Sequence, residues 1–213
     1  MNLAINELEQ EILKEIVNIG LAKAADAFAV IAKEKVLINA PSVQIVELEK
    51  VGNAVPEYEK FNIIIQSSLT GTLSGNTFLL FSEEQADRLA EICLGTLKTN
   101  SDHHYNQLRS SLLLEIGNII TGSLVTQLSN ILKVNVFGSV PELKNNVIGN
   151  VLSSMNTAYP YYKPFIFTVK TQFVYSWRSV ELPFLLIFDL DAFGKVLAIV
   201  RTYIQNGKSI LTL

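Results

Sequence analysis

The chain carries one motif twice, and this repetition restricts how it can fold. The motif is a glutamate, an asparagine three residues later and a proline further along. Its two copies, shifted by 100 residues, are Glu15, Asn18 and Pro41, and then Glu115, Asn118 and Pro141. In both copies the glutamate and asparagine lie in a long apolar segment with helical spacing. A repeat of this length indicates two copies of one supersecondary unit that bury apolar surface against each other.

Each half reads as a long helix, short strands, two long strands and a closing helix. The first half has these ranges: helix 5–33, strands 36–38, 43–48, 61–69 and 72–81, and helix 83–97, with a loop at 51–60. After a polar linker at 98–105, the second half has helix 107–132, strand 134–136, a strand beyond Pro141, strands 165–175 and 180–188, and helix 190–205. The sequence therefore predicts an α+β fold: one internally duplicated pseudo-twofold unit, with a shared, mostly antiparallel sheet and two long motif-bearing helices. We expect a single domain over residues 1–213, made of repeats at about 5–97 and 107–206.

Composition excludes several classes of function. The net charge is −3 and no dense basic run occurs, so nucleic acid is not an expected partner. No uninterrupted apolar run reaches the roughly 18 residues that cross a bilayer, so no membrane span is expected. The acidic N-terminus does not resemble a signal peptide, and the single cysteine, Cys93, is typical of a reducing cytoplasm. We therefore expect a cytoplasmic protein. His103 and His104 fall in the linker and lack the further ligands of a metal site.

Helix geometry places the motif residues together. At about 100° per residue, positions 11, 15, 18 and 22 fall within a stripe about 60° wide, and positions 111, 115, 118 and 122 form the same stripe on the second helix. The last position of each stripe is small, Ala22 or Gly122, which leaves room for another molecule to approach.

The chemistry of this pair is limited. A glutamate and an asparagine offer too few oxygen ligands for a metal, and asparagine is not a nucleophile. A carboxamide can hold a water molecule at a fixed angle, however, and a glutamate can bind a lysine of another protein. These properties suit in-line attack of water on a phosphoryl group that another macromolecule presents with its own metal. A solvated helix face is the alternative that the residues alone leave open.

At these residues the chain resembles the CheC family of chemotaxis phosphatases, which act on the phosphorylated response regulator CheY. The family pattern is Asp or Ser, three residues, Glu, two residues, Asn, about 21–22 residues and Pro. The second copy matches in full, at Ser111, Glu115, Asn118 and Pro141. The first copy matches at Glu15, Asn18 and Pro41 and departs at Glu11, which stands where the family has Asp or Ser.

The resemblance implies a mechanism. Asn18 or Asn118 would orient the water that attacks the aspartyl phosphate, and Glu15 or Glu115 would bind the regulator's lysine. Position 11 or 111 would support the helix face, while Pro41 and Pro141 are expected to shape strand connections. The chain would need no metal or cofactor of its own, because the regulator would supply the Mg²⁺. We expect Glu115 and Asn118 to form the stronger site, since Glu11 adds negative charge to the first.

The implied partner is a phosphorylated CheY-type regulator, and some relatives also bind a CheD-type receptor deamidase. The main alternative is a non-catalytic adaptor that binds a regulator or a deamidase without hydrolysis. A flagellar-switch component of the FliY kind is disfavoured, because the chain ends at Leu213 without the expected additional domain.

Overall fold

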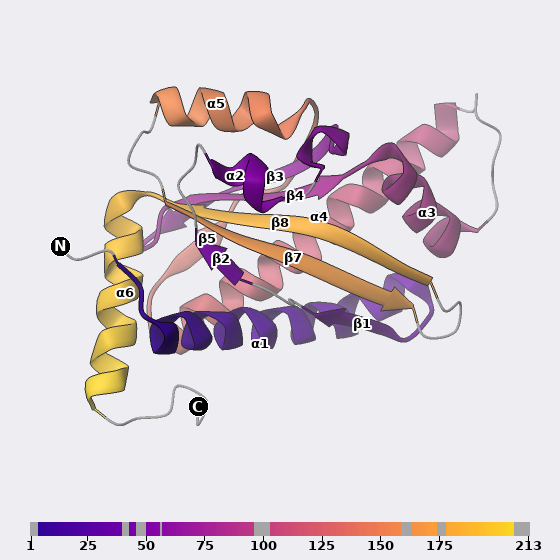
Figure 1. Cartoon of the computed structure of the whole chain (residues 1–213). Coiled ribbons are helices and arrows are strands. Elements are labelled where there is room, and N and C mark those ends of the chain that lie inside the picture. The colour runs from indigo at the N-terminus through magenta and orange to yellow at the C-terminus, as the bar shows by residue number, and fades with distance from the viewer. Residues whose placement is uncertain are drawn as a thin grey trace.

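One antiparallel sheet with helices on both faces forms the protein, which Figure 1 shows as a computed structural model. The structure describes residues 4–39, 43–45, 50–55, 57–95, 103–158, 163–173 and 178–206. Pro41 lies outside these residues, as do parts of the predicted strands 43–48 and 165–175 and most of the predicted linker.

The two repeats exchange their short strands. The described strands are β1 (Val36–Asn39), β2 (Val43–Ile45), β3 (Ile63–Gly71), β4 (Gly75–Phe81), β5 (Val136–Gly138), β6 (Glu142–Asn145), β7 (Lys163–Phe173) and β8 (Arg178–Phe188). Their order is β1-β7-β8-β4-β3-β5, where β2 also pairs with β7 and β6 with β3. The short strands of each repeat therefore pair with a long strand of the other, and β4 and β8 join the repeats at the centre. The predicted α+β fold with a shared antiparallel sheet is confirmed.

Two long helices, α1 (Glu7–Ala32) and α4 (His103–Leu132), cover one face of this sheet (Figure 1). The side chain of Asn6 caps α1 by accepting a hydrogen bond from the backbone N–H of Glu9 at 2.8 Å. Both helices are followed by a lysine in the left-handed conformation, Lys33 (φ 53°) and Lys133 (φ 54°). The duplication thus extends to the way in which the two helices end.

The helices α1 and α4 approach each other closely at Gly20. A Cβ atom on Gly20 would lie 3.0 Å from Cα of Leu124, so the backbones meet here with no side chain between them. Figure 1 shows α4 running in the opposite direction to α1. By length and mean hydropathy α4 alone among the described helices could cross a membrane, but half of that stretch is buried inside the protein, as in the core helix of a globular fold.

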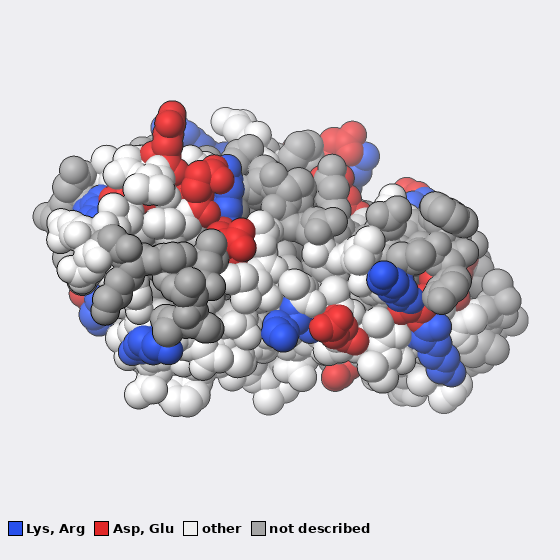
Figure 2. Space-filling view, turned by 90° about the horizontal axis from the view of Figure 1, so that it is seen from below, with Lys and Arg blue, Asp and Glu red and all other residues white. Residues whose placement is uncertain are grey.

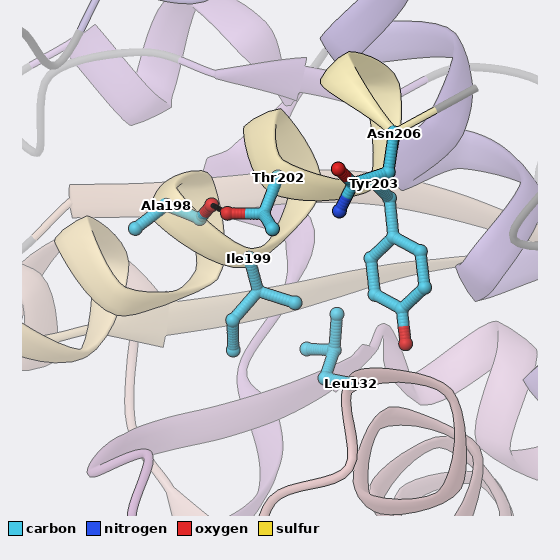
Figure 3. Close-up of a pocket in the computed structure, with 6 residues that line it drawn as sticks. All are labelled: Leu132, Ala198, Ile199, Thr202, Tyr203 and Asn206. Carbon is cyan, nitrogen blue, oxygen red and sulfur yellow. Dashed lines mark hydrogen bonds between the residues drawn. The ribbon is translucent and has the colours of Figure 1, made fainter. Parts of the chain in front are cut away.

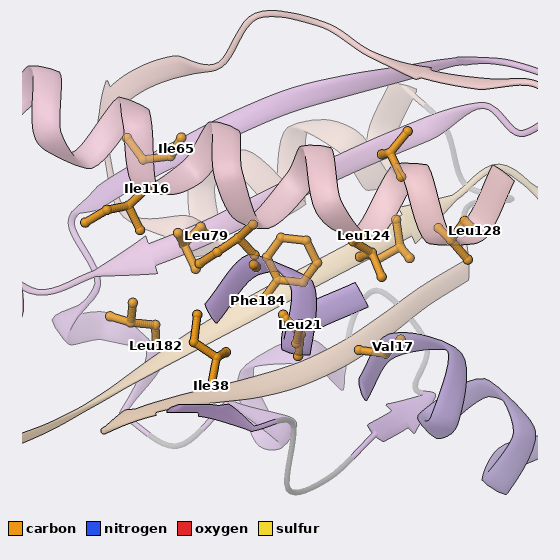
Figure 4. Close-up of a cluster of buried hydrophobic side chains, with 14 of the residues drawn as sticks. Val17, Leu21, Ile38, Ile65, Leu79, Ile116, Leu124, Leu128, Leu182 and Phe184 are labelled. Carbon is orange, nitrogen blue, oxygen red and sulfur yellow. The ribbon is translucent and has the colours of Figure 1, made fainter. Parts of the chain in front are cut away.

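The core is divided between the two faces of the sheet. The larger part lies between the sheet and α1 and α4, where Leu21, Leu124 and Phe184 are fully buried (Figure 4). Two shorter helices, α3 (Glu83–Leu94) and α6 (Leu190–Gln205), supply Leu89 and Val196 to the same core. A smaller cluster on the opposite face packs beneath α2 (Val51–Ala54) and α5 (Ile148–Ala158).

Three sequence-based expectations were wrong. The predicted loop at 51–60 contains α2 and the 3-10 helix η2 (Tyr58–Lys60), and α5 was not predicted at all. Packing explains these elements, because Val51 and Ile148 are buried on the second face of the sheet. The histidines expected in the linker, His103 and His104, belong to the first turn of α4, which begins four residues before the predicted helix.

An ion pair between a buried glutamate and a half-buried arginine holds the start of α1 against α6. Glu9 is only 3% exposed, and its carboxylate accepts a hydrogen bond from Nε of Arg201 at 2.7 Å. The same carboxylate accepts the backbone N–H of Asn6 at 3.0 Å, and Nη2 of Arg201 donates to the backbone oxygen of Ala4 at 2.7 Å. The hydrogen bond from Arg201 holds the pKa of Glu9 below its ordinary value of 4.5, although burial opposes this shift.

This ion pair predicts a pH-dependent stability. Because the pKa of Glu9 is lower in the folded state than in the unfolded state, its contribution is present above about pH 4.5 and is lost as the pH falls through the folded-state value. We expect Glu9→Gln to be less stable than the wild type in urea denaturation at pH 7, and this difference to shrink at pH 3. A difference of equal size at both pH values would contradict the expectation.

Candidate functional site

Helix packing turns both motif stripes outward. On α1, the residues next to the motif, such as Ile16 and Val17, are buried against the core, whereas Asn18 is exposed and Glu15 half-buried. On α4, Ile116 and Gly117 are buried in the same way. The exposed motif residues of this helix are Ser111, Glu115, Asn118 and Gly122. The structure therefore places both Glu–Asn pairs on the outer surface of the helix layer.

The four candidate side chains have no partner within the described part of the chain. No hydrogen bond or ion pair there involves the side chains of Glu15, Asn18, Glu115 or Asn118. Glu11 differs, because its carboxylate lies 2.6 Å from Nζ of Lys14. An exposed carboxylate and an exposed carboxamide, one helical turn apart and unpartnered, are available to bind another molecule.

The face that carries these residues is sparsely charged at its centre. Figure 2 views the molecule from the side on which α1 lies, where uncharged surface surrounds isolated acidic and basic side chains. The flanks of the two motifs differ. On α1, Glu11 and Asp26 are acidic and exposed, whereas Ser111 and Thr126 hold the corresponding places on α4. On α1, Lys14 and Lys23 offset these two acidic charges, so the flanks of the two motifs differ in the number of charged groups and not in their net charge.

Sequence reasoning missed two apolar residues on the α1 stripe. Leu8 is 54% exposed and Val30 is 78% exposed, and both project within about 60° of Glu15 around the helix. A helical projection extended by two turns in each direction would have found them. They add apolar area to the outer face of α1, and the corresponding residues of α4 are the half-buried Leu108 and the polar Asn130.

Pro141 stands apart from the exposed stripe of α4. It is half-buried in the connection between β5 and β6, and Ser139 fastens this connection to β3. The backbone N–H of Ser139 donates to the backbone oxygen of Ser68 at 2.8 Å, and the backbone N–H of Ser68 donates to Oγ of Ser139 at 2.9 Å. This position agrees with a role in shaping the strand connection.

Other reactive groups do not assemble a second centre among the described residues. Burial raises the pKa of the Cys93 thiol to about 12, so that it stays protonated at neutral pH. His103 shares a contact of 3.1 Å with the side chain of Gln107 on the next turn. Within the described ranges, no three His, Cys, Asp or Glu side chains gather as they would around a metal ion.

A pocket of about 420 Å³ lies away from the motifs, between α6 and the C-terminal end of α4 (Figure 3). Its lining is mainly apolar and consists of Leu132, Ala198, Ile199, Thr202, Tyr203 and Asn206. The hydroxyl of Thr202 donates its hydrogen to the backbone oxygen of Ala198 at 2.8 Å, so towards a ligand it could act only as an acceptor. None of the motif residues that the structure describes lines this pocket, so the candidate site is the outer surface of the helices.

Comparison with known proteins identifies relatives of the same kind. The profile of the CheC-like family matches residues 108–145, a segment that contains Ser111, Glu115, Asn118 and Pro141. The chain is 28% identical to the CheY-P phosphatase CheC of Bacillus subtilis over 155 residues, which cover 70% of this chain and 72% of CheC. It is 26% identical to the flagellar motor switch phosphatase FliY of the same organism, over 66% of this chain but only 36% of FliY.

Solved structures share the fold at low sequence identity. Thermotoga maritima FliY superposes with a TM-score of 0.68 at 18% identity, covering 93% of this chain and 98% of that structure. FliM from a FliG–FliM complex of H. pylori superposes with a TM-score of 0.66 at 10% identity, covering 91% of this chain and 100% of that structure. CheX from a CheX–CheY complex of Borrelia burgdorferi superposes with a TM-score of 0.52 at 13% identity, covering 82% of this chain and 98% of that structure. The duplicated motif, the family match, the curated relatives and the fold agree that the chain resembles the CheC-type chemotaxis phosphatases of the CheC, CheX and FliY superfamily.

Proposed function

We propose that the chain is a phosphatase that hydrolyses the aspartyl phosphate of a CheY-type response regulator in chemotaxis signalling. The observation that carries this proposal is the outward-facing Glu–Asn pair, exposed on α4 and with Glu15 half-buried on α1, whose side chains have no hydrogen-bond or ion-pair partner in the described part of the protein. The similarity to CheC and FliY, both phosphatases by name, supports it. The similarity in fold to a CheX that binds CheY supports the choice of partner.

In the proposed reaction the regulator docks against one motif helix. The carboxamide of Asn118 holds a water molecule in line with the phosphorus atom, and the carboxylate of Glu115 binds the regulator's lysine. The water oxygen forms the new bond to phosphorus while the bond to the aspartate oxygen breaks. The products are a free carboxylate and inorganic phosphate, which takes both protons of the water. Asn18 and Glu15 would act in the same way on α1.

The proposal gives this chain no metal of its own. The solved CheX–CheY complex contains beryllofluoride and Mg²⁺, which supports a reaction in which the regulator supplies the metal. The chain's contribution is then to present an amide and a carboxylate one turn apart, on helices whose inner faces are packed in the core.

The main rival function is that of an adaptor that binds a regulator or a CheD-type deamidase without hydrolysis. FliM, which shares the fold, shows only that the fold occurs beyond proteins named as phosphatases. Phosphate release from a Mg²⁺-bound phosphorylated regulator, with and without the protein, distinguishes the two functions when binding is measured in parallel. We expect binding and faster release. Binding without acceleration would support the adaptor and contradict the phosphatase.

A charge reversal tests the docking role of Glu115. Glu115→Lys is expected to weaken binding of the phosphorylated regulator about tenfold or more, because the new ammonium group repels the regulator's lysine. The measurement requires a protein in which the first site is disabled by Glu15→Lys. The loss should diminish at high salt, since exposed charges are screened.

The matched control is Glu59→Lys, which makes the same charge change at an exposed residue of η2. It should leave the affinity close to that of the parent protein. If the two substitutions lowered the affinity equally, the effect at Glu115 would come from the change in net charge alone. Glu115 would then have no specific part in docking.

A further inference from the structure

Three glycines interrupt the long helices, and internal packing accounts for only two of them. A Cβ atom on Gly20 would lie 3.0 Å from Cα of Leu124, and one on Gly117 would lie 2.4 Å from Cγ2 of Ile65. A Cβ atom on Gly122 would meet nothing within 4 Å in the described structure, and Gly122 is not among the glycines with positive φ. Neither packing nor backbone conformation in the free protein therefore calls for glycine at position 122.

Glycine in the interior of a helix lowers its stability, because the unfolded chain loses more conformational freedom on folding than it would with alanine. Gly122 lies well inside α4, with ten residues of the helix still to follow, so it carries this penalty in full. The hydroxyl of Thr126 donates to the backbone oxygen of Gly122 at 2.8 Å, so this carbonyl already has a partner beyond the helix ladder. What Gly122 adds to the surface is space.

That space lies beside the proposed catalytic asparagine. Gly122 follows Asn118 by one turn, about 6 Å along the helix and on the same exposed stripe. It also lies two residues before Leu124, where α4 meets α1 at Gly20. In the first repeat the residue at the equivalent position of α1, Ala22, is exposed and small as well. The exposed stripe of α4 therefore continues beyond Asn118 with a residue that has no side chain.

We propose that Gly122 is the point where the main chain of the phosphorylated regulator, beside its phosphoaspartate, comes against α4. The inference rests on the proposed function and adds a positioning residue to it. A side chain at position 122 would hold the regulator away from α4 and keep the phosphorus atom out of reach of the water on Asn118. The first site carries Ala22 at this place. Its methyl group therefore keeps the regulator farther from α1 than the regulator can come to α4 at Gly122.

The test uses a protein with its first site disabled by Glu15→Lys, and a regulator that carries beryllofluoride on its aspartate. We expect Gly122→Leu to lower affinity for this regulator at least tenfold and to slow phosphate release from the phosphorylated form. Gly122→Ala should lower affinity several-fold while raising the melting temperature of the free protein by about 2–4 °C. This opposite movement of stability and affinity would not arise from damage to the fold.

The matched control is Asn130→Leu, which adds the same side chain to an exposed position two turns further along α4. It should change affinity less than twofold. If Gly122→Leu and Asn130→Leu bind alike while the parent protein still accelerates phosphate release, the role of Gly122 is overturned and the phosphatase stands. If the parent protein does not bind the regulator, both fail. Should Gly122→Leu not fold, the Gly122→Ala variant decides by the same comparison.

Discussion

Replacing Asn18 and Asn118 together with alanine is expected to lower the accelerated rate of phosphate release about 10²-fold or more. Losing one group that positions a reacting atom commonly has an effect of this size. Both side chains are exposed and, in the described part of the chain, make no hydrogen bond, so their removal costs the fold no hydrogen bond there. The double variant should therefore melt at the wild-type temperature and still bind the regulator.

The single variants rank the two sites. Asn118→Ala should remove most of the activity and Asn18→Ala a smaller part, because only the second copy has the full motif with Ser111, whereas Glu11 stands at that place in the first. Asn130→Ala is the matched control, being an asparagine exposed on α4 outside the motif. Phosphate release is measured for all four variants at equal regulator occupancy. A double variant that keeps the wild-type rate would show that neither asparagine orients the attacking water.

Much of this candidate site could be predicted from the sequence, because it depends on local geometry. The spacing of Glu115 and Asn118 fixes their common direction once the segment is a helix, and the apolar residues between them fix which side is buried. The same reasoning predicted α6 with its observed limits, 190–205. The small residue at position 122 already predicted room beside Asn118, but only the structure shows that no other part of the described fold fills that space.

The rest of the fold could not be predicted from the sequence in the same way, because it depends on contacts between segments that are far apart in the chain. The short strands of each repeat pair with the other repeat, and nothing in the segment 136–145 indicates that it will lie beside β3. The helix α5 has the sequence IGNVLSSMNTA, whose Gly, Asn, Ser and Thr residues are weak helix formers. It is helical because Ile148 and Leu152 bury against the second face of the sheet. Tertiary contacts here outweigh local preference.

Phe184→Ala is expected to lower the free energy of unfolding by about 3–5 kcal/mol, the usual loss for a phenylalanine removed from a core. Phe184 is fully buried on β8 and lies directly opposite Leu79 of β4 in the sheet. Its ring occupies the core between the sheet and the motif helices, near Leu21 of α1 (Figure 4). Urea denaturation at pH 7 measures the change. Phe137→Ala is the control. Because Phe137 is 61% exposed, its replacement should lower the free energy of unfolding by less than about 0.5 kcal/mol.

The shape of that transition tests whether the two repeats form one domain. Phe184 belongs to the second repeat, yet its cross-strand neighbour Leu79 belongs to the first, and the short strands are exchanged between the repeats. If the repeats share one core, unfolding of Phe184→Ala remains a single transition, and both motif helices lose their structure together. Two transitions, with only the second displaced by the substitution, would mean that the repeats fold separately. In that case α1 would keep its exposed Asn18 in place after the second repeat had unfolded.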